Sequence, residues 1–179
     1  EAYYDFCGRT AIKLMESYPR LIITRTFSKA MGMAGLRVGY LMARPELATE
    51  IAKAKLPYNV NQFSLTAIQV ALDHPERFQT AIDAILKEKA RVGDELRRIP
   101  GIRVYPSGAN FFLFELPIAP GRVFEELYRK GVLIRDVSGY PMLSRCLRVS
   151  IGTREENDRF LSGLQNCIAA AVEIKSSGA

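Results

Sequence analysis

Two short apolar runs, Leu21–Phe27 and Arg37–Ala43, read as β-strands joined by a polar segment that contains Lys29, Gly32 and Gly35. In open α/β sheets, ligands bind beyond the carboxyl ends of strands, and Lys29 lies at such an end. Glycine lets the backbone turn tightly or approach a ligand because it has no Cβ. This stretch therefore predicts an α/β fold with a ligand site at the end of its first strand.

The residue types around Lys29 suit a ligand that has both an aldehyde and a phosphate. A lysine amine forms a Schiff base with a carbonyl compound. The hydroxyls of Thr26 and Ser28 and the guanidinium of Arg37 suit a phosphate. Pyridoxal phosphate carries both groups and is therefore the predicted cofactor. On spacing alone, a solvated Ser-Lys turn is the alternative interpretation.

Several segments resemble one enzyme family, in the order in which the family has them. The segment Arg25–Tyr40 resembles the lysine motif of the fold-type I pyridoxal-phosphate aminotransferases, and is most similar to that of the histidinol-phosphate aminotransferases. Glu1–Phe6 resembles the Asp-Glu-Ala-Tyr strand end of that family, and Leu56–Asn61 resembles its Pro-Tyr-Asn-Val loop. Gly131–Asp136 and Cys146–Glu156 resemble its C-terminal arginine strands.

The resemblance implies a role for each residue near the cofactor. Lys29 would bind the cofactor as a Schiff base and then move a proton between the substrate α-carbon and the cofactor. Tyr3 would donate a hydrogen bond to the phenolic oxygen of the ring, with the neighbouring Tyr4 as the alternative. The cofactor phosphate would be bound by three residues, Thr26, Ser28 and Arg37.

Two arginines in predicted strands, Arg135 and Arg148, form a second group of candidates. An arginine in the middle of a strand is unusual unless it is paired. The resemblance implies that both bind the substrate, through its phosphate or through the carboxylate of glutamate and 2-oxoglutarate. From the residues alone, ion pairs with Asp136 or Glu155 on an exposed face are an alternative. Tyr58 would line the site, or would pack as an ordinary loop tyrosine.

The resemblance further implies an activity. The expected reaction is pyridoxal-phosphate-dependent transamination of L-histidinol phosphate with 2-oxoglutarate, in histidine biosynthesis, by a homodimer that acts on small molecules. Two alternatives remain open. One is a related fold-type I enzyme, such as an aromatic-amino-acid aminotransferase or a threonine-phosphate decarboxylase. The other is a truncated remnant that folds without catalysing a reaction.

The start of the sequence bears on these alternatives. The chain begins at Glu1, whereas the motif that it resembles has an aspartate one residue earlier. The cofactor-binding residues that the family has upstream of that aspartate have no counterpart in this sequence. We therefore expect a C-terminal fragment, roughly half of the expected enzyme, that is inactive by itself.

Composition limits the other function classes. The net charge is +6, but the basic residues are spread among acids without a block of like charge, so we expect no nucleic-acid partner. The three cysteines lack disulfide or metal spacing, which favours a reducing cytoplasm. We expect no metal site, because His74 is the only histidine. No apolar run is long enough to span a bilayer, so no membrane partner is expected.

The pattern of apolar residues predicts the elements and three regions. Residues 1–72 would be part of a large α/β domain, 73–100 a linking helix, and 101–179 a small α/β C-terminal domain. The resemblance implies that the large domain binds pyridoxal phosphate. Thr153 and Glu156 predict a capping box at the start of a terminal helix. The predicted strands cover 21–27, 37–43, 102–105, 110–116, 132–137 and 146–151, and the other predicted helices cover 45–55, 64–72, 75–98 and 121–130.

Overall fold

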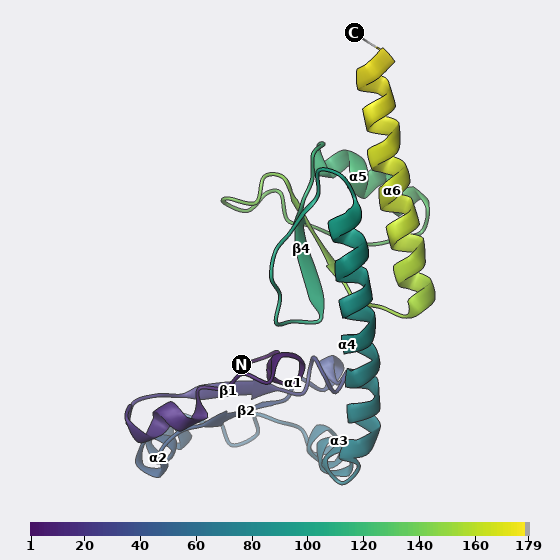
Figure 1. Cartoon of the computed structure of the whole chain (residues 1–179). Coiled ribbons are helices and arrows are strands. Elements are labelled where there is room, and N and C mark those ends of the chain that lie inside the picture. Colours follow the sequence, from purple (N-terminus) through teal and green to yellow (C-terminus); the bar gives the residue numbers. More distant parts are fainter. Residues whose placement is uncertain (178–179) are drawn as a thin grey trace. The chain divides into compact units, whose positions relative to one another are not determined.

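The computed structural model describes residues 1–177 of the chain (Figure 1). It consists of two compact units, of which the first covers Glu1–Ile82 and the second begins at Asp83. Our predicted borders after residues 72 and 100 stay a prediction, and the last two residues of the predicted region 101–179 lie outside the described residues. The border between the two units falls within a single long helix, α4 (Pro75–Arg98).

The first unit contains a two-stranded antiparallel sheet and several short helices. Strands β1 (Ile23–Thr26) and β2 (Gly39–Met42) pair along their whole length, from Ile23 opposite Met42 to Thr26 opposite Gly39. Both strands lie inside the runs predicted from sequence, which confirms that prediction. The helical elements of this unit are α1 (Tyr4–Cys7), η1 (Ile12–Glu16), η2 (Ala34–Leu36), α2 (Pro45–Lys53) and α3 (Gln62–Leu72).

Helix α3 begins two residues before the predicted start. Asn61 is its N-cap, and the Asn61 Oδ1 accepts a hydrogen bond from the backbone N–H of Ser64 at 2.8 Å. This bond satisfies one of the backbone donors that the first turn of a helix leaves without a partner. On the inner side of α3, Ile68 packs in a small buried cluster with Phe27 and Val38 from the two ends of the β1–β2 loop.

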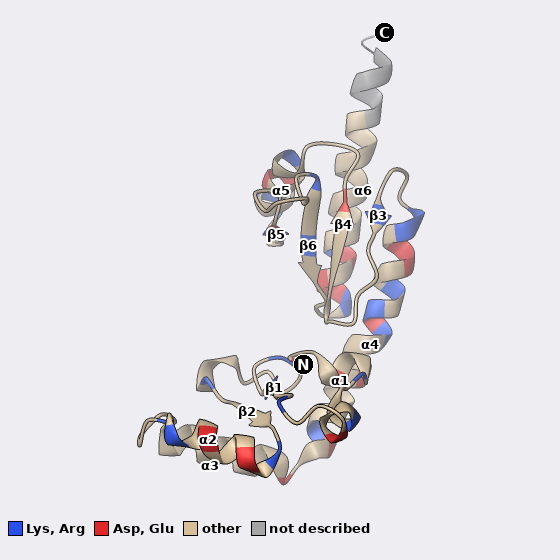
Figure 2. Cartoon of the chain, turned by 90° about the vertical axis from the view of Figure 1, so that its left-hand side faces the viewer, with Lys and Arg blue, Asp and Glu red and all other residues tan. Residues whose placement is uncertain are grey.

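The second unit is a four-stranded antiparallel sheet packed against helices. The strand order is β3 (Arg103–Val104), β4 (Phe111–Glu115), β6 (Cys146–Ser150) and β5 (Arg135–Asp136). The helices are α4, α5 (Pro120–Arg129) and α6 (Arg154–Ser177). Helix α4 has the predicted bounds. Figure 2 shows residues of both charge signs interspersed along α4 rather than gathered by sign.

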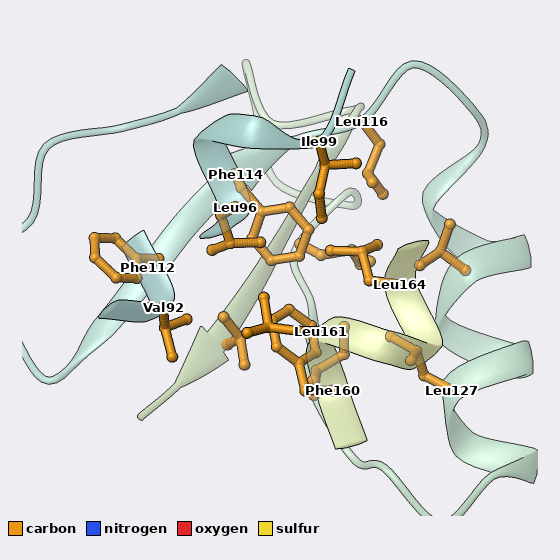
Figure 3. Packing of buried hydrophobic residues seen from close by; sticks show 14 of the residues in the cluster. Val92, Leu96, Ile99, Phe112, Phe114, Leu116, Leu127, Phe160, Leu161 and Leu164 are labelled. Carbon is orange, nitrogen blue, oxygen red and sulfur yellow. The ribbon is translucent and has the colours of Figure 1, made fainter. Parts of the chain in front are cut away.

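The core of the second unit lies between its sheet and its helices. Phe114 of β4 is fully buried, and its ring meets that of Phe160 of α6 edge to face at 6.0 Å between centroids. Figure 3 shows the side chains of this cluster converging from α4, β4 and α6. Apart from these two rings, the cluster includes Val92, Leu96, Ile99, Phe112, Leu116, Leu127, Leu147, Val149, Leu161 and Leu164.

The pleat of β4 and β6 separates the core from an open face. Leu147 and Val149 of β6 are buried, whereas Arg148 between them is only partly buried. Neighbouring residues of a strand point to opposite faces of the sheet, so Arg148 lies on the face away from the core. The same alternation on β4 assigns Phe111 and Leu113 to the open face.

The start of α6 has the predicted capping box. The carboxylate of Glu156 accepts hydrogen bonds from the Thr153 backbone N–H at 2.7 Å and from the Thr153 hydroxyl at 3.0 Å. In return, the Thr153 hydroxyl accepts a bond from the Glu156 N–H at 3.3 Å. The Thr153 backbone N–H is the main reason that the pKa of Glu156 is lowered. The capping box is therefore confirmed.

Candidate functional site

Lys29 lies on a closed loop between β1 and β2. The backbone N–H of Phe27 donates to the Val38 carbonyl at 3.3 Å, which closes the base of the loop. Within it, the N–H of Gly32 donates to the Lys29 carbonyl at 3.0 Å, and Gly32 has a positive φ of 64° that favours glycine. The backbone around Lys29 is therefore fixed, while the Lys29 side chain is exposed.

Tyr3 is the tyrosine that lies beside Lys29. The Lys29 Nζ is 5.7 Å from the centroid of the Tyr3 ring. The neighbouring Tyr4 instead faces Arg25, whose guanidinium carbon is 3.5 Å from the Tyr4 ring centroid. Of the two tyrosines that the sequence left as alternatives for the cofactor ring, the geometry favours Tyr3.

An ion pair fastens the segment that carries Tyr3 to strand β1. The Glu1 Oε2 accepts from Arg25 Nε at 3.1 Å and from Arg25 Nη2 at 2.9 Å, so two charged donors converge on one carboxylate oxygen. The Glu1 Oε1 also accepts from the Ala11 backbone N–H at 2.7 Å. This backbone bond is the main reason that the pKa of Glu1 is lowered, with the bonds from Arg25 and Thr10 adding to it against the effect of burial. In the sequence, Glu1 and Arg25 stand out only as parts of motifs, and nothing there indicates that they pair.

The three predicted phosphate ligands come from the two ends of the loop. The Thr26 hydroxyl donates to the Val38 carbonyl at 3.3 Å and accepts from the Ser28 N–H at 3.1 Å, so Thr26 also fastens the loop. Ser28 follows directly and is partly buried. Arg37 is exposed, and its Nη1 donates to the Ala34 carbonyl at 2.9 Å. A guanidinium has five N–H donors, so most of them remain for a ligand.

A buried serine, which sequence reasoning missed, ties the same loop to α3. Ser64 is 2% exposed, and its hydroxyl donates to the Leu36 carbonyl at 3.1 Å. The Asn61 Nδ2 donates to that hydroxyl at 3.0 Å. The signal that could have found this contact is the Asn61-x-x-Ser64 spacing of a helix N-cap, although the spacing does not reveal the partner Leu36.

Tyr58 lies in the segment between α2 and α3. Its side chain is 97% exposed, so the alternative that Tyr58 packs as an ordinary loop tyrosine is wrong. Its contribution to a substrate site stays a prediction.

Arg135 and Arg148 stand directly opposite each other on the neighbouring strands β5 and β6. The alternative ion pairs are absent: among the described residues neither arginine pairs with a carboxylate, and the Asp136 Oδ1 accepts from the Ser138 backbone N–H at 2.8 Å. The Arg148 Nε is buried and has no hydrogen-bond partner. The Arg148 guanidinium carbon lies 4.9 Å from the centroid of the Phe111 ring.

The two arginines line a pocket on the open face of the sheet. Its volume is about 480 Å³, and the apolar part of its wall includes Phe111, Leu113 and Val137. No carboxylate is among its lining residues. Guanidinium groups bind phosphate and carboxylate in a forked geometry, so the pocket suits an anion that also carries an apolar portion.

Two further kinds of feature are absent from the described part of the chain. Within residues 1–177, no cluster of His, Cys, Asp and Glu side chains has an arrangement that could hold a metal ion. Over the same residues, no helix combines the length and the apolar character needed to cross a membrane.

Comparison with known proteins identifies the family. The profile of the family described as aminotransferase class I and II matches residues 1–164. The chain belongs to the aminotransferase class I and II family. The resemblance of the Lys29 motif to aminotransferases is thereby confirmed, and the fold is an α/β fold like that of pyridoxal-phosphate-dependent aminotransferases.

Individual members of the family are similar over most of this chain. A histidinol-phosphate aminotransferase from Chlorobaculum tepidum is 41% identical over 166 residues, which are 92% of this chain and 47% of that protein. The structure of the histidinol-phosphate aminotransferase from Clostridium acetobutylicum has a TM-score of 0.86 at 28% identity, covering 95% of this chain and 53% of that one. The enzyme of that name from Sinorhizobium meliloti, in complex with pyridoxal-5'-phosphate, has a TM-score of 0.81 at 28% identity over 96% of this chain and 48% of that one. The chain spans about half the length of these relatives.

Proposed function

We propose that a protein of the relatives' full length that carries this sequence transfers the amino group of L-histidinol phosphate to 2-oxoglutarate, with pyridoxal phosphate as cofactor, in histidine biosynthesis. The observation that carries the proposal is the fixed loop that presents the amine of Lys29 beside Tyr3. Membership in the aminotransferase family supports the reaction class. The names of the relatives support the choice of substrate.

The residues of the first unit fit pyridoxal phosphate. The loop between β1 and β2 carries the exposed amine of Lys29 and the exposed guanidinium of Arg37. The phenol of Tyr3 lies beside Lys29. When bound, the cofactor supplies an aldehyde that condenses with amines and a ring that stabilises negative charge on the substrate α-carbon. Arg37 would bind the phosphate by charged hydrogen bonds, assisted by Ser28 and Thr26. Tyr3 would donate to the phenolic oxygen of the ring.

Lys29 has two tasks in this proposal. Its amine would hold the cofactor covalently. Once free, the same amine would accept the proton of the substrate α-carbon and donate it again during the transfer. Because the amine is already beside the proton that it accepts, the proton transfer needs no diffusional encounter between base and substrate.

Arg135 and Arg148 would anchor the anionic end of each substrate. The two half-reactions use different anions, the phosphate of histidinol phosphate and the carboxylates of glutamate and 2-oxoglutarate. A guanidinium fork binds either anion, so one pocket can serve both in turn. The buried Arg148 Nε without a partner supports this role, because a buried donor without a bond is costly. Tyr58 would be a further substrate-binding residue.

The larger organisation is part of the same proposal. Residues 1–72 would belong to the large cofactor-binding domain, 73–100 would link the domains, and 101–179 would form the small domain. The complete enzyme would be a cytoplasmic homodimer whose partners are small molecules rather than nucleic acid or membranes.

Borohydride trapping tests the cofactor site. The full-length protein would be incubated with pyridoxal phosphate, reduced and mapped by peptide analysis, and a single pyridoxyl label on Lys29 is expected. A Lys29→Ala variant should lose the label, whereas a Lys53→Ala variant, which changes an exposed lysine of α2, should keep it. Labels scattered over other lysines of the unchanged protein, with Lys29 unmodified, would refute the proposal.

A substrate panel tests the reaction and separates the related enzymes. The Arg135 and Arg148 pair suits any amine that carries a phosphate or a carboxylate, which is why a decarboxylase of threonine phosphate is the second candidate. We expect glutamate to form from 2-oxoglutarate with histidinol phosphate, at a higher kcat/KM than with phenylalanine. Release of carbon dioxide from threonine phosphate, without glutamate formation, would favour the second candidate.

A further inference from the structure

Arg37 has a backbone conformation that ordinary residues avoid. Its φ of 56° and ψ of 41° place it in the left-handed region, where a side chain with a Cβ is strained. Such a conformation is unfavourable for a residue with a Cβ and persists only when the surrounding structure fixes it. The strain lies at the residue that the proposed function assigns to the cofactor phosphate.

The contacts that fix this conformation converge on the preceding residue. The Leu36 carbonyl belongs to the peptide group that joins Leu36 to Arg37, and it accepts the hydroxyl proton of Ser64 at 3.1 Å. Because Ser64 is 2% exposed, water has little access to replace that bond. The Leu36 side chain also packs against the buried cluster that includes Ile68, one turn after Ser64 on α3.

Asn61 in turn holds Ser64 in place. The Asn61 Oδ1 accepts from the Ser64 backbone N–H at 2.8 Å, and its Nδ2 donates to the Ser64 hydroxyl oxygen at 3.0 Å. With that oxygen accepting from Asn61, the hydroxyl proton is directed to the Leu36 carbonyl. The start of α3 thus holds the Leu36–Arg37 peptide in place through the hydrogen bonds of Asn61 and Ser64.

We propose that Ser64 is a positioning residue for cofactor binding: it fixes the Leu36–Arg37 peptide so that Arg37 presents its guanidinium to the cofactor phosphate. This inference rests on the proposed function and adds to it a residue that does not touch the cofactor. A group that acts only through Arg37 affects recognition of the phosphate and leaves recognition of the aldehyde by Lys29 unchanged.

Comparison of two ligands tests this separation. The full-length protein, stripped of cofactor, would be titrated with pyridoxal phosphate and, separately, with pyridoxal, which has the aldehyde but no phosphate. In the Ser64→Ala variant we expect the Kd for pyridoxal phosphate to rise about tenfold and the Kd for pyridoxal to change less than about twofold. The matched control is Thr66→Ala, which removes an exposed hydroxyl from the same helix and should change neither Kd.

A double-mutant cycle shows whether the effect passes through Arg37. In an Arg37→Ala background, Ser64→Ala should change the Kd for pyridoxal phosphate by less than about twofold, because the group that it positions is gone. If Ser64→Ala does not fold, the same comparison of Kd values is made with the Asn61→Asp variant. It keeps the oxygen that caps α3 but removes the donor to Ser64, and should weaken pyridoxal phosphate binding relative to pyridoxal.

Three results would overturn the inference while leaving the proposed function intact. They are an unchanged Kd for pyridoxal phosphate in Ser64→Ala, an equal loss for both ligands, and a full loss that persists in the Arg37→Ala background. Failure of the unchanged protein to bind pyridoxal phosphate at Lys29 would instead refute the proposed function itself.

Discussion

The two units of this chain hold their functional residues by different means. In the second unit, Arg148 lies on a sheet whose other face covers a large apolar core. In the first unit, the loop of Lys29 is fastened by a small cluster and by polar contacts, namely the ion pair of Glu1 with Arg25 and the bond of Ser64 to Leu36. A binding site can therefore be made rigid either by apolar burial or by polar contacts.

The exposed side chains point to the same contrast. Phe63 of α3 is 75% exposed in the first unit, whereas Phe114 of β4 is fully buried in the second. A truncation of the same residue type therefore removes very different amounts of packing in the two units. Truncation of these two phenylalanines should therefore have very unequal effects on the free energy of unfolding.

Phe114→Ala should lower the free energy of unfolding by about 3–5 kcal/mol, because it leaves a cavity where the ring meets Phe160. Phe63→Ala should change it by less than about 0.5 kcal/mol, because the exposed ring loses little packing. Urea denaturation of both variants measures the difference. Similar losses for the two would contradict the contrast between the units.

Arg148→Ala separates the function of the second unit from its stability. In the full-length enzyme, loss of a forked charge contact in the pocket should reduce kcat/KM by the equivalent of about 2–5 kcal/mol. Because Arg148 faces away from the core, the free energy of unfolding should change by less than about 1 kcal/mol.

The control for Arg148 is Arg129→Ala. This arginine of α5 is 69% exposed and forms an ion pair with Glu126, so its removal should leave kcat/KM unchanged. A kcat/KM for Arg148→Ala close to that of the unchanged enzyme would remove Arg148 from the substrate site.

The dependence of unfolding free energy on acid pH compares one polar contact in each unit. The carboxyl group is that of Glu1 in the first unit and that of Glu88 in the second. The hydrogen bond from Arg91, assisted by Asn157, lowers the pKa of Glu88 from 4.5 to about 2. The pKa of Glu1 is lowered from the same value, mainly by the Ala11 N–H. Both contacts therefore stabilise the fold fully above pH 4.5, and lose that contribution as the pH falls through the lowered pKa of each carboxyl.

Glu88→Gln should cost about 1–3 kcal/mol of unfolding free energy at pH 7, and should flatten the loss of stability between pH 4.5 and about 2. Glu1→Gln should have a smaller effect of the same sign. The control is Asp94→Asn, which changes a 65% exposed member of an α4 ion pair. Denaturation midpoints across this pH range measure all three, and a Glu88→Gln profile parallel to that of the unchanged protein would contradict the prediction.

The sequence predicted the elements well where a pattern within one element decides them. The spacing of apolar residues defined α4 from Pro75 to Arg98, and the two apolar runs contained β1 and β2. The strand predicted over 132–137 was too long, since only Arg135 and Asp136 pair with β6. An apolar run shows that a segment can be buried, but the neighbouring strand decides how much of it pairs.

The site was predictable only in part, for a similar reason. The motif led to Lys29 and Tyr3, whose proximity the structure shows. The bond from Ser64 to Leu36 joins residues that are 28 positions apart, and no local pattern connects them. The left-handed backbone of Arg37 depends on that distant contact, because residue preference alone disfavours it.

The alternation of side chains along β6 has a consequence for how this protein can change over time. Leu147 and Val149 maintain the fold, while Arg148 between them faces the proposed substrate. Selection can therefore act on the middle residue without disturbing its neighbours. A single strand thus lets substrate preference diverge among descendants while the architecture is inherited unchanged.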